Sequence, residues 1–197
     1  MTTPDPDWPG STVRPTRADA RRNYDRLLAA ANEVFAEQGA DAPLDVIARR
    51  AGLGSGTLYR HFPTRDLLMT AVFRELIETL CARGDELADT ATPADALTAW
   101  LRGLIEVTTR RRLASLLLAS RQDDASQLVR ACRTALTTTL TRLLTAAQRT
   151  GSIRTDLDAG DLLAYSHAVA AVVEHGDGGP AHPDHLLDLL VNGLRTR

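Results

Sequence analysis

The fold is decided by residues 44–67, which read LDVIARRAGLGSGTLYRHFPTRDL. Leu44 and Ile47 recur at helical spacing, and the glycines of the segment 51–54 break that helix. A second short helix then follows over residues 55–62, and a proline ends it. A helix, a four-residue turn and a helix form the helix-turn-helix arrangement, in which the second helix enters the DNA major groove.

The turn and the second helix have the chemistry that this arrangement requires. A glycine just after the first helix can adopt a positive φ without a Cβ clash. Leu53 is the apolar residue of the turn and is expected to fill the core between the two helices. The second helix is apolar at Leu58 and Phe62 and polar on its other side. A solvated helical corner also fits this pattern, but the polar side favours a binding surface.

Four segments carry a resemblance to a known family. Residues 51–53, 56–62 and 65–68 follow a helical stretch over residues 27–39, in the order and spacing typical of the family. Together they resemble the TetR family of bacterial transcriptional regulators, over about residues 20–70. The resemblance implies an all-α fold of about nine helices. An N-terminal three-helix helix-turn-helix domain would precede a C-terminal helical bundle for ligand binding and dimerisation.

Three regions are predicted along the chain. Residues 1–16 hold four prolines and form a disordered arm by composition. Residues 17–66 form the helix-turn-helix DNA-binding domain, and residues 67–197 form the ligand-binding and dimerisation domain. The arginines that follow the arm belong either to a solvated tail or to a basic arm that touches phosphate or the minor groove.

The resemblance implies that the second helix of the motif binds double-stranded DNA. Thr57, Tyr59 and His61 match family positions that usually contact DNA, and two arginines are well placed to join them. Hydroxyl and imidazole groups suit phosphate oxygens, whereas the guanidinium of Arg60 can pair with guanine for ~1–3 kcal/mol of discrimination. Small residues at the start of this helix allow close approach of the backbone. The predicted DNA-binding residues are Ser55, Gly56, Thr57, Tyr59, Arg60, His61 and Arg65.

The sequence departs from the family pattern in two places. Pro43 and Asp45 stand where the family often has a small hydroxyl residue and a basic or polar residue. A carboxylate is favoured near a helix N-terminus but is unfavourable beside phosphate. The family usually has a serine one position before Ser55, so here Ser55 is predicted to cap the second helix. Base specificity is therefore expected to differ from that of better-known relatives.

Two C-terminal segments predict a dimer. Residues 158–174 are apolar almost all round, and residues 183–195 carry a stripe of leucines. A helix without a polar face must be buried on two sides. Two such helices from each copy form a four-helix interface about a two-fold axis, so a homodimer on an inverted-repeat operator is predicted.

The predicted binding site for a small-molecule effector lies in the same domain. Each candidate also fits a plain core position. Tyr165 and His167 stand out because they place polar atoms on an otherwise apolar helix, and Tyr165 equally fits the dimer seam. The candidate lining residues are Trp100, Leu104, Leu117, Cys132, Leu136, Tyr165 and His167.

Composition bounds the remaining possibilities. The chain of 197 residues is 44% hydrophobic but has no apolar run of ~18 residues and no signal-peptide pattern, so a cytoplasmic protein without a membrane span is expected. Cys81 and Cys132 are expected to be buried in a reducing compartment, unpaired. Net charge is −2, although residues 14–65 carry nine arginines and six acids, a net charge of +3.

No cofactor, metal site or catalytic residue is predicted. His175, His182 and His185 lie near aspartates, but glycines and a proline spread them along a loop. The chain shows no nucleophile elbow and no phosphate-binding glycine loop. The predicted function is therefore a repressor that a small molecule releases from DNA. Two alternatives are an activator and a helical adaptor or dimerisation module that has lost specific DNA binding.

Overall fold

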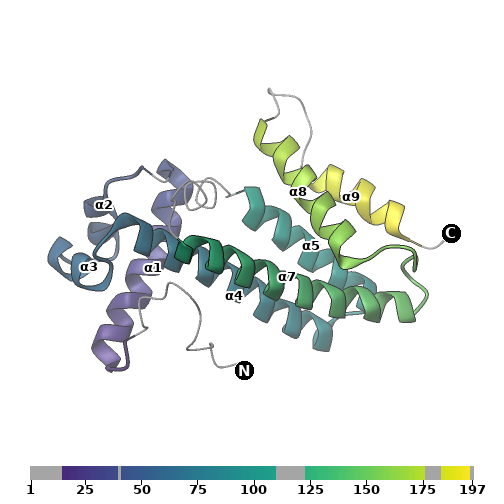
Figure 1. The fold of residues 1–197 in the computed structure, drawn as a ribbon, viewed down its shortest axis with the longest axis horizontal. Coiled ribbons are helices and arrows are strands. Elements are labelled where there is room, and N and C mark those ends of the chain that lie inside the picture. The colour runs from purple at the N-terminus through teal and green to yellow at the C-terminus, as the bar shows by residue number, and fades with distance from the viewer. Residues whose placement is uncertain (1–14, 40, 110–122, 176–182, 196–197) are drawn as a thin grey trace. The chain divides into compact units, whose positions relative to one another are not determined.

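A computed structural model describes residues 15–39, 41–109, 123–175 and 183–195. These ranges form eight α-helices and no β-strand, which confirms the predicted all-α class (Figure 1). Residues 113–120, whose apolar run also predicts a short helix, and nearly all of the predicted arm lie outside the described residues. The helices are α1 (Ala18–Gln38), α2 (Leu44–Arg50), α3 (Ser55–His61), α4 (Arg65–Thr90), α5 (Pro93–Thr109), α7 (Asp123–Arg149), α8 (Ala159–His175) and α9 (Pro183–Leu194).

The described residues pack as two compact units. The N-terminal unit comprises residues 15–39, 41–76 and 123–132, and the C-terminal unit comprises residues 77–109, 133–175 and 183–195. The helices α4 and α7 each contribute residues to both units. The boundary that the sequence suggested, after residue 66, lies earlier in α4 than the boundary between these units.

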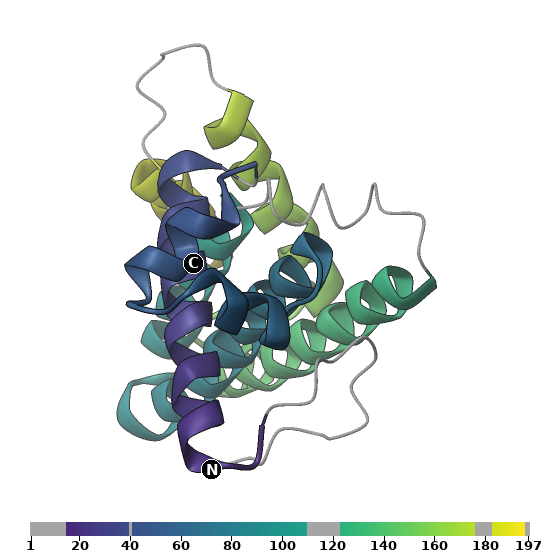
Figure 2. The same ribbon diagram turned by 90° about the vertical axis from the view of Figure 1, so that its left-hand side faces the viewer.

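The N-terminal unit is built on the apolar stripe of α1. Leu27 lies three residues after Tyr24 and Val34 seven residues after Leu27, and all three are buried. The helix α1 packs on α2, and α2 packs on α3. Figure 2 looks onto this unit, with α1 in purple and α2 and α3 in blue. Helices as short as α2 and α3 are only marginally stable alone. The core that they share with α1 therefore stabilises them.

The C-terminal unit is centred on α5. This helix packs against both α8 and α9, and its Trp100 is completely buried. The indole Nε1 of Trp100 donates a hydrogen bond to the Leu80 carbonyl at 2.9 Å. A Cβ at Gly84 would lie 2.5 Å from Cγ2 of Thr139 and 3.0 Å from the indole nitrogen. Glycine at position 84 therefore permits the close packing around Trp100.

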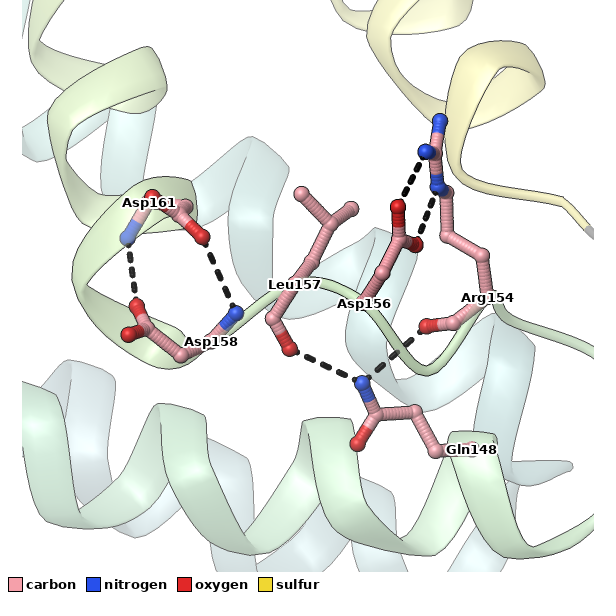
Figure 3. Close-up of polar contacts among 6 residues, drawn as sticks. All are labelled: Gln148, Arg154, Asp156, Leu157, Asp158 and Asp161. Carbon is pink, nitrogen blue, oxygen red and sulfur yellow. Dashed lines mark hydrogen bonds and ion pairs between the residues drawn. The ribbon is translucent and has the colours of Figure 1, made fainter.

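Side-chain hydrogen bonds hold the connection from α7 to α8 (Figure 3). Nε2 of Gln148, near the end of α7, donates to the carbonyls of Arg154 and Leu157, both at 3.0 Å. The guanidinium of Arg154 in turn pairs with the Asp156 carboxylate. These bonds satisfy backbone carbonyls that the irregular connection would otherwise leave without an intramolecular partner.

The same connection is tied to the end of α9. The amide of Arg154 donates to the Leu194 carbonyl at 3.0 Å, and Ile153 forms an isolated antiparallel bridge with Arg195. At the start of α8, the side chains of Asp158 and Asp161 each accept the other's backbone amide, a reciprocal cap. Specific polar contacts thus fix the start of α8 and the end of α9.

Candidate nucleic-acid interface

The turn between α2 and α3 has the geometry that the glycines predicted. Gly52 has a φ of +64°, and its amide donates to the Arg49 carbonyl at 2.9 Å. The next amide, of Leu53, returns to the Ala48 carbonyl at 2.9 Å, and the Leu53 side chain packs against the core. These bonds close the end of α2 and let the chain turn into α3.

The helix α3 is divided into a buried side and an exposed side. Leu58 and the following Phe62 are completely buried, which confirms their assignment to the core. Tyr59 is 49% exposed and Arg60 is also exposed. Two adjacent polar side chains are thus presented to solvent on a helix whose opposite side is anchored.

Ser55 does not cap α3, contrary to the prediction. The N-cap residue is Gly54, which has extended backbone angles and makes no side-chain capping bond. Ser55 is the first helical residue, and its Oγ donates to Oδ1 of Asp45 on α2 at 2.7 Å. The turn brings the starts of α2 and α3 together, so the Ser55 hydroxyl bonds to a residue of α2 and not to its own helix.

His61 and Thr57 are only partly exposed. The His61 ring meets Tyr24 edge-on, with centroids 6.0 Å apart and ring planes at 73°. Burial lowers the pKa of His61, so the imidazole is mainly neutral at pH 7. The charged form of His61 is therefore disfavoured, and the neutral ring retains one N–H donor and one acceptor.

Arg65 lies just after α3 and forms a hydrogen bond within the protein. Its Nη1 donates to the Ala42 carbonyl at 2.7 Å, which joins the start of α4 to the segment before α2. Thr64 caps α4 by accepting the Leu67 amide at 3.3 Å. Arg65 thus contributes to the shape of the motif through a contact that the sequence did not suggest.

Two other arginines also bind within this unit. Arg50 forms a bidentate pair with Glu37 at 2.7 and 2.8 Å, which raises the pKa of Arg50 and lowers that of Glu37. Nη2 of Arg26 approaches the Gly52 carbonyl at 3.4 Å and braces the turn. Sequence reasoning missed this brace because no local signal relates a residue in α1 to a turn 26 positions later.

Arg49 is a further exposed cation that sequence reasoning did not select. It lies in the last turn of α2, and within the described ranges neither it nor Arg60 bonds to another side chain. Its only sequence signal was its position beside the turn. Both guanidiniums keep their donors available to an external anion.

Comparison with known families extends this local picture to the whole chain. Residues 27–72 match the model described as bacterial regulatory proteins, tetR family. Residues 92–196 match the model described as transcriptional regulator SbtR-like, C-terminal domain. The chain belongs to the TetR family of transcriptional regulators.

Solved TetR structures share this fold over nearly their full length. A TetR transcriptional regulator from Streptomyces coelicolor is 40% identical, with a TM-score of 0.75 over 87% of this chain and 98% of that one. A TetR regulatory protein from Mycobacterium vanbaalenii is 32% identical, with a TM-score of 0.74 over 92% and 100%. Both helical parts of the chain therefore have TetR counterparts.

Curated TetR-type regulators match over shorter stretches. The transcriptional repressor KstR2 of Mycolicibacterium smegmatis is 33% identical over 116 residues, which are 58% of this chain and 54% of KstR2. The regulator TtgW of Pseudomonas putida is 45% identical over 61 residues, 46% of its length. The match thus spans about half the length of these relatives.

The predicted effector-site residues of this TetR-family chain do not share one environment. Trp100, Leu104 and Leu136 are buried in the C-terminal unit, whereas Cys132 is buried in the N-terminal unit. Tyr165 is largely exposed, and His167 is partly buried. Leu117 lies outside the described residues.

The described residues of the TetR-family chain show neither a membrane-spanning helix nor a metal-binding cluster. None of the described helices combines the length and apolar character needed to cross a bilayer. No three His, Cys, Asp or Glu side chains within the described ranges are grouped to hold a metal ion. Cys81 and Cys132 are not joined in a disulfide bond.

Proposed function

We propose that this TetR-family chain is a transcriptional repressor that binds an inverted-repeat operator as a homodimer and is released by a small-molecule effector. The observation that carries the proposal is α3, which exposes Tyr59 and Arg60 while Leu58 and the C-cap residue Phe62 are buried. In a helix-turn-helix protein this helix enters the major groove. The guanidinium of Arg60 supplies the donors that guanine O6 and N7 accept.

Exposed apolar residues support the homodimer. Tyr165 and Val172 of α8 are 57% and 50% exposed, and Leu189 of α9 is 57% exposed. The first two are seven residues apart, so they lie on one side of α8. Large apolar side chains exposed on one side of a helix favour burial against a protein partner. A second copy placed about a two-fold axis would cover the same residues on both chains and pair two recognition helices on one duplex.

Release by an effector fits the all-helical C-terminal unit. The fold of a Bacillus subtilis regulator, FadR, whose structure is in complex with stearoyl-CoA, is similar at a TM-score of 0.59 and 21% identity. An effector would shift repression only by binding the DNA-competent and released states with different affinities. Repression itself is supported by the matched relative KstR2, which is named a repressor.

Selection of random duplexes by the purified protein tests the proposal. We expect an enriched inverted repeat, bound with an affinity that falls steeply as salt rises, because several phosphates release counterions. The double variant Tyr59→Ala, Arg60→Ala should bind the selected site at least about tenfold more weakly, given ~1–3 kcal/mol for one good base pairing.

Arg149→Ala is the matched control, since it removes an exposed arginine from α7 in the C-terminal unit. It should leave operator binding nearly unchanged. If a folded and dimeric protein enriches no duplex at low salt, the proposed DNA-binding function is refuted. The helical adaptor would then be supported instead.

A further inference from the structure

Asp45 and Ser55 form an exposed polar pair beside the recognition helix. Asp45 lies in the first turn of α2, and Ser55 is the first residue of α3. The Ser55 hydroxyl donates to Oδ1 of Asp45 at 2.7 Å, and both residues are exposed. The pair therefore sets a carboxylate next to the helix that is proposed to enter the groove.

The residues on either side leave this carboxylate uncovered. Gly54 and Gly56 flank Ser55, and a Cβ built on either glycine would meet no heavy atom within 4 Å. No long side chain of the segment 54–56 extends past the pair. Residues 54–56 therefore leave the Asp45 carboxylate open to solvent.

The pair presents hydrogen-bond acceptors only. An ionised carboxylate has no hydrogen to donate, and the single hydroxyl hydrogen of Ser55 is directed at Asp45. The oxygens that remain repel phosphate oxygens and the O6 and N7 acceptors of guanine. They match an exocyclic amino group, and in the major groove cytosine offers N4–H₂ without a neighbouring acceptor of its own.

We propose that Asp45, positioned by Ser55, is a specificity-determining residue that accepts a hydrogen bond from cytosine N4 at one position of each operator half-site. This inference rests on the DNA-binding function proposed above. The start of α2 favours the negative charge through the helix dipole, which offsets part of the repulsion from nearby phosphates. Asp45 thereby acts on base choice, and Ser55 acts through Asp45.

Parallel selections with the wild type and Asp45→Asn test the assignment. The amide keeps the size of the side chain and an oxygen for Ser55, but it adds a donor and removes the charge. We expect the wild type to require cytosine at one position per half-site. Asp45→Asn should reduce the preference for cytosine there by about 5- to 150-fold, the range of one good base contact. Ser55→Ala should reduce it by a smaller factor.

Asp41→Asn is the matched control, because it removes an exposed carboxylate from the same unit outside the two helices. It should alter affinity for all duplexes equally, with base preference unchanged. The same uniform change in Asp45→Asn would overturn the inference and leave Asp45 as a charge that only repels phosphate. A wild-type preference for adenine at the affected position would also overturn it.

The selection separates this inference from the function on which it rests. An enriched inverted repeat whose base preferences are identical for wild type and Asp45→Asn refutes the role of Asp45 and retains the DNA reader. No enriched duplex for either protein refutes the reader, and the role of Asp45 with it. Thermal melting of each variant shows whether a loss of binding reflects unfolding.

Discussion

The helices α3 and α8 use their apolar residues in different ways. Leu58 of α3 and the C-cap residue Phe62 are fully covered by the chain itself. On α8 some apolar residues are covered, but Tyr165 and Val172 remain about half exposed or more. The first helix is complete within one copy and shows polar groups outward. The second leaves apolar area that only an additional surface can bury.

The two helices should therefore affect different properties, the stability of the chain for α3 and its association for α8. Removing a buried group from α3 should act on stability, whereas changing an exposed apolar group on α8 should act on association. The exposed polar groups of α3 should act on neither. Three measurements, given in order of decreasing expected effect, test whether the two helices differ in this way.

The largest effect is expected from Phe62→Ala. Phe62 is completely buried and packs against Tyr24 with ring centroids 4.9 Å apart. Removing the ring should lower the free energy of unfolding of the N-terminal unit by about 3–5 kcal/mol, measured by denaturant titration. The neighbouring Tyr59→Ala should change it by no more than ~0.5 kcal/mol. Equal losses for both variants would show that α3 is not divided as described.

A smaller effect is expected from the double variant Tyr165→Asp, Val172→Asp. Two carboxylates buried at a two-fold interface lack partners, so the dimer dissociation constant should rise at least tenfold, ~1.4 kcal/mol, in sedimentation equilibrium. Thr145→Asp, on an exposed position of α7, provides the control. Unchanged association of the double variant would exclude this side of α8 from the interface.

The smallest effect concerns the pH dependence of His61. Burial lowers the pKa of His61 in the folded chain, so the unfolded chain binds this proton more readily. The stability from the neutral imidazole is complete above the unfolded pKa of about 6.5 and is lost as pH falls through the folded pKa. The effect is small because the ring is only partly buried.

Comparison with His61→Gln isolates this contribution. The unfolding free energy of the wild type should fall relative to that of the variant between about pH 8 and pH 5. A difference that does not change with pH would mean that burial of this ring has no titratable consequence.

Local patterns predicted the skeleton of the N-terminal unit. The helical spacing of Tyr24, Leu27 and Val34 agrees with the buried side of α1, and Leu58 and Phe62 were predicted as core residues and are buried. Helical periodicity determines these positions through neighbours three to seven residues away, so they are readable from one sequence. The match of residues 27–72 to the tetR model agrees with the family resemblance.

The partners of the polar side chains were not predictable in this way. Ser55 was expected to cap its own helix but bonds to Asp45, and Arg65 bonds to the Ala42 carbonyl. Each partner is distant in sequence and is brought close by packing of the core. The sequence also showed that α8 is apolar almost all round. The exposure of Tyr165 could not be predicted from it, because this depends on how α5 and α9 cover the helix.

The bond from the Arg154 amide to the Leu194 carbonyl gives the C-terminal unit an internal reporter. Arg154 lies in an irregular connection, where an amide without such a partner exchanges its hydrogen with solvent rapidly. Here protection requires that the last turn of α9 stay in place, because its carbonyl is the acceptor. The deuterium uptake of this single amide therefore measures how often the end of α9 opens, under any condition in which an effector or a second copy is added.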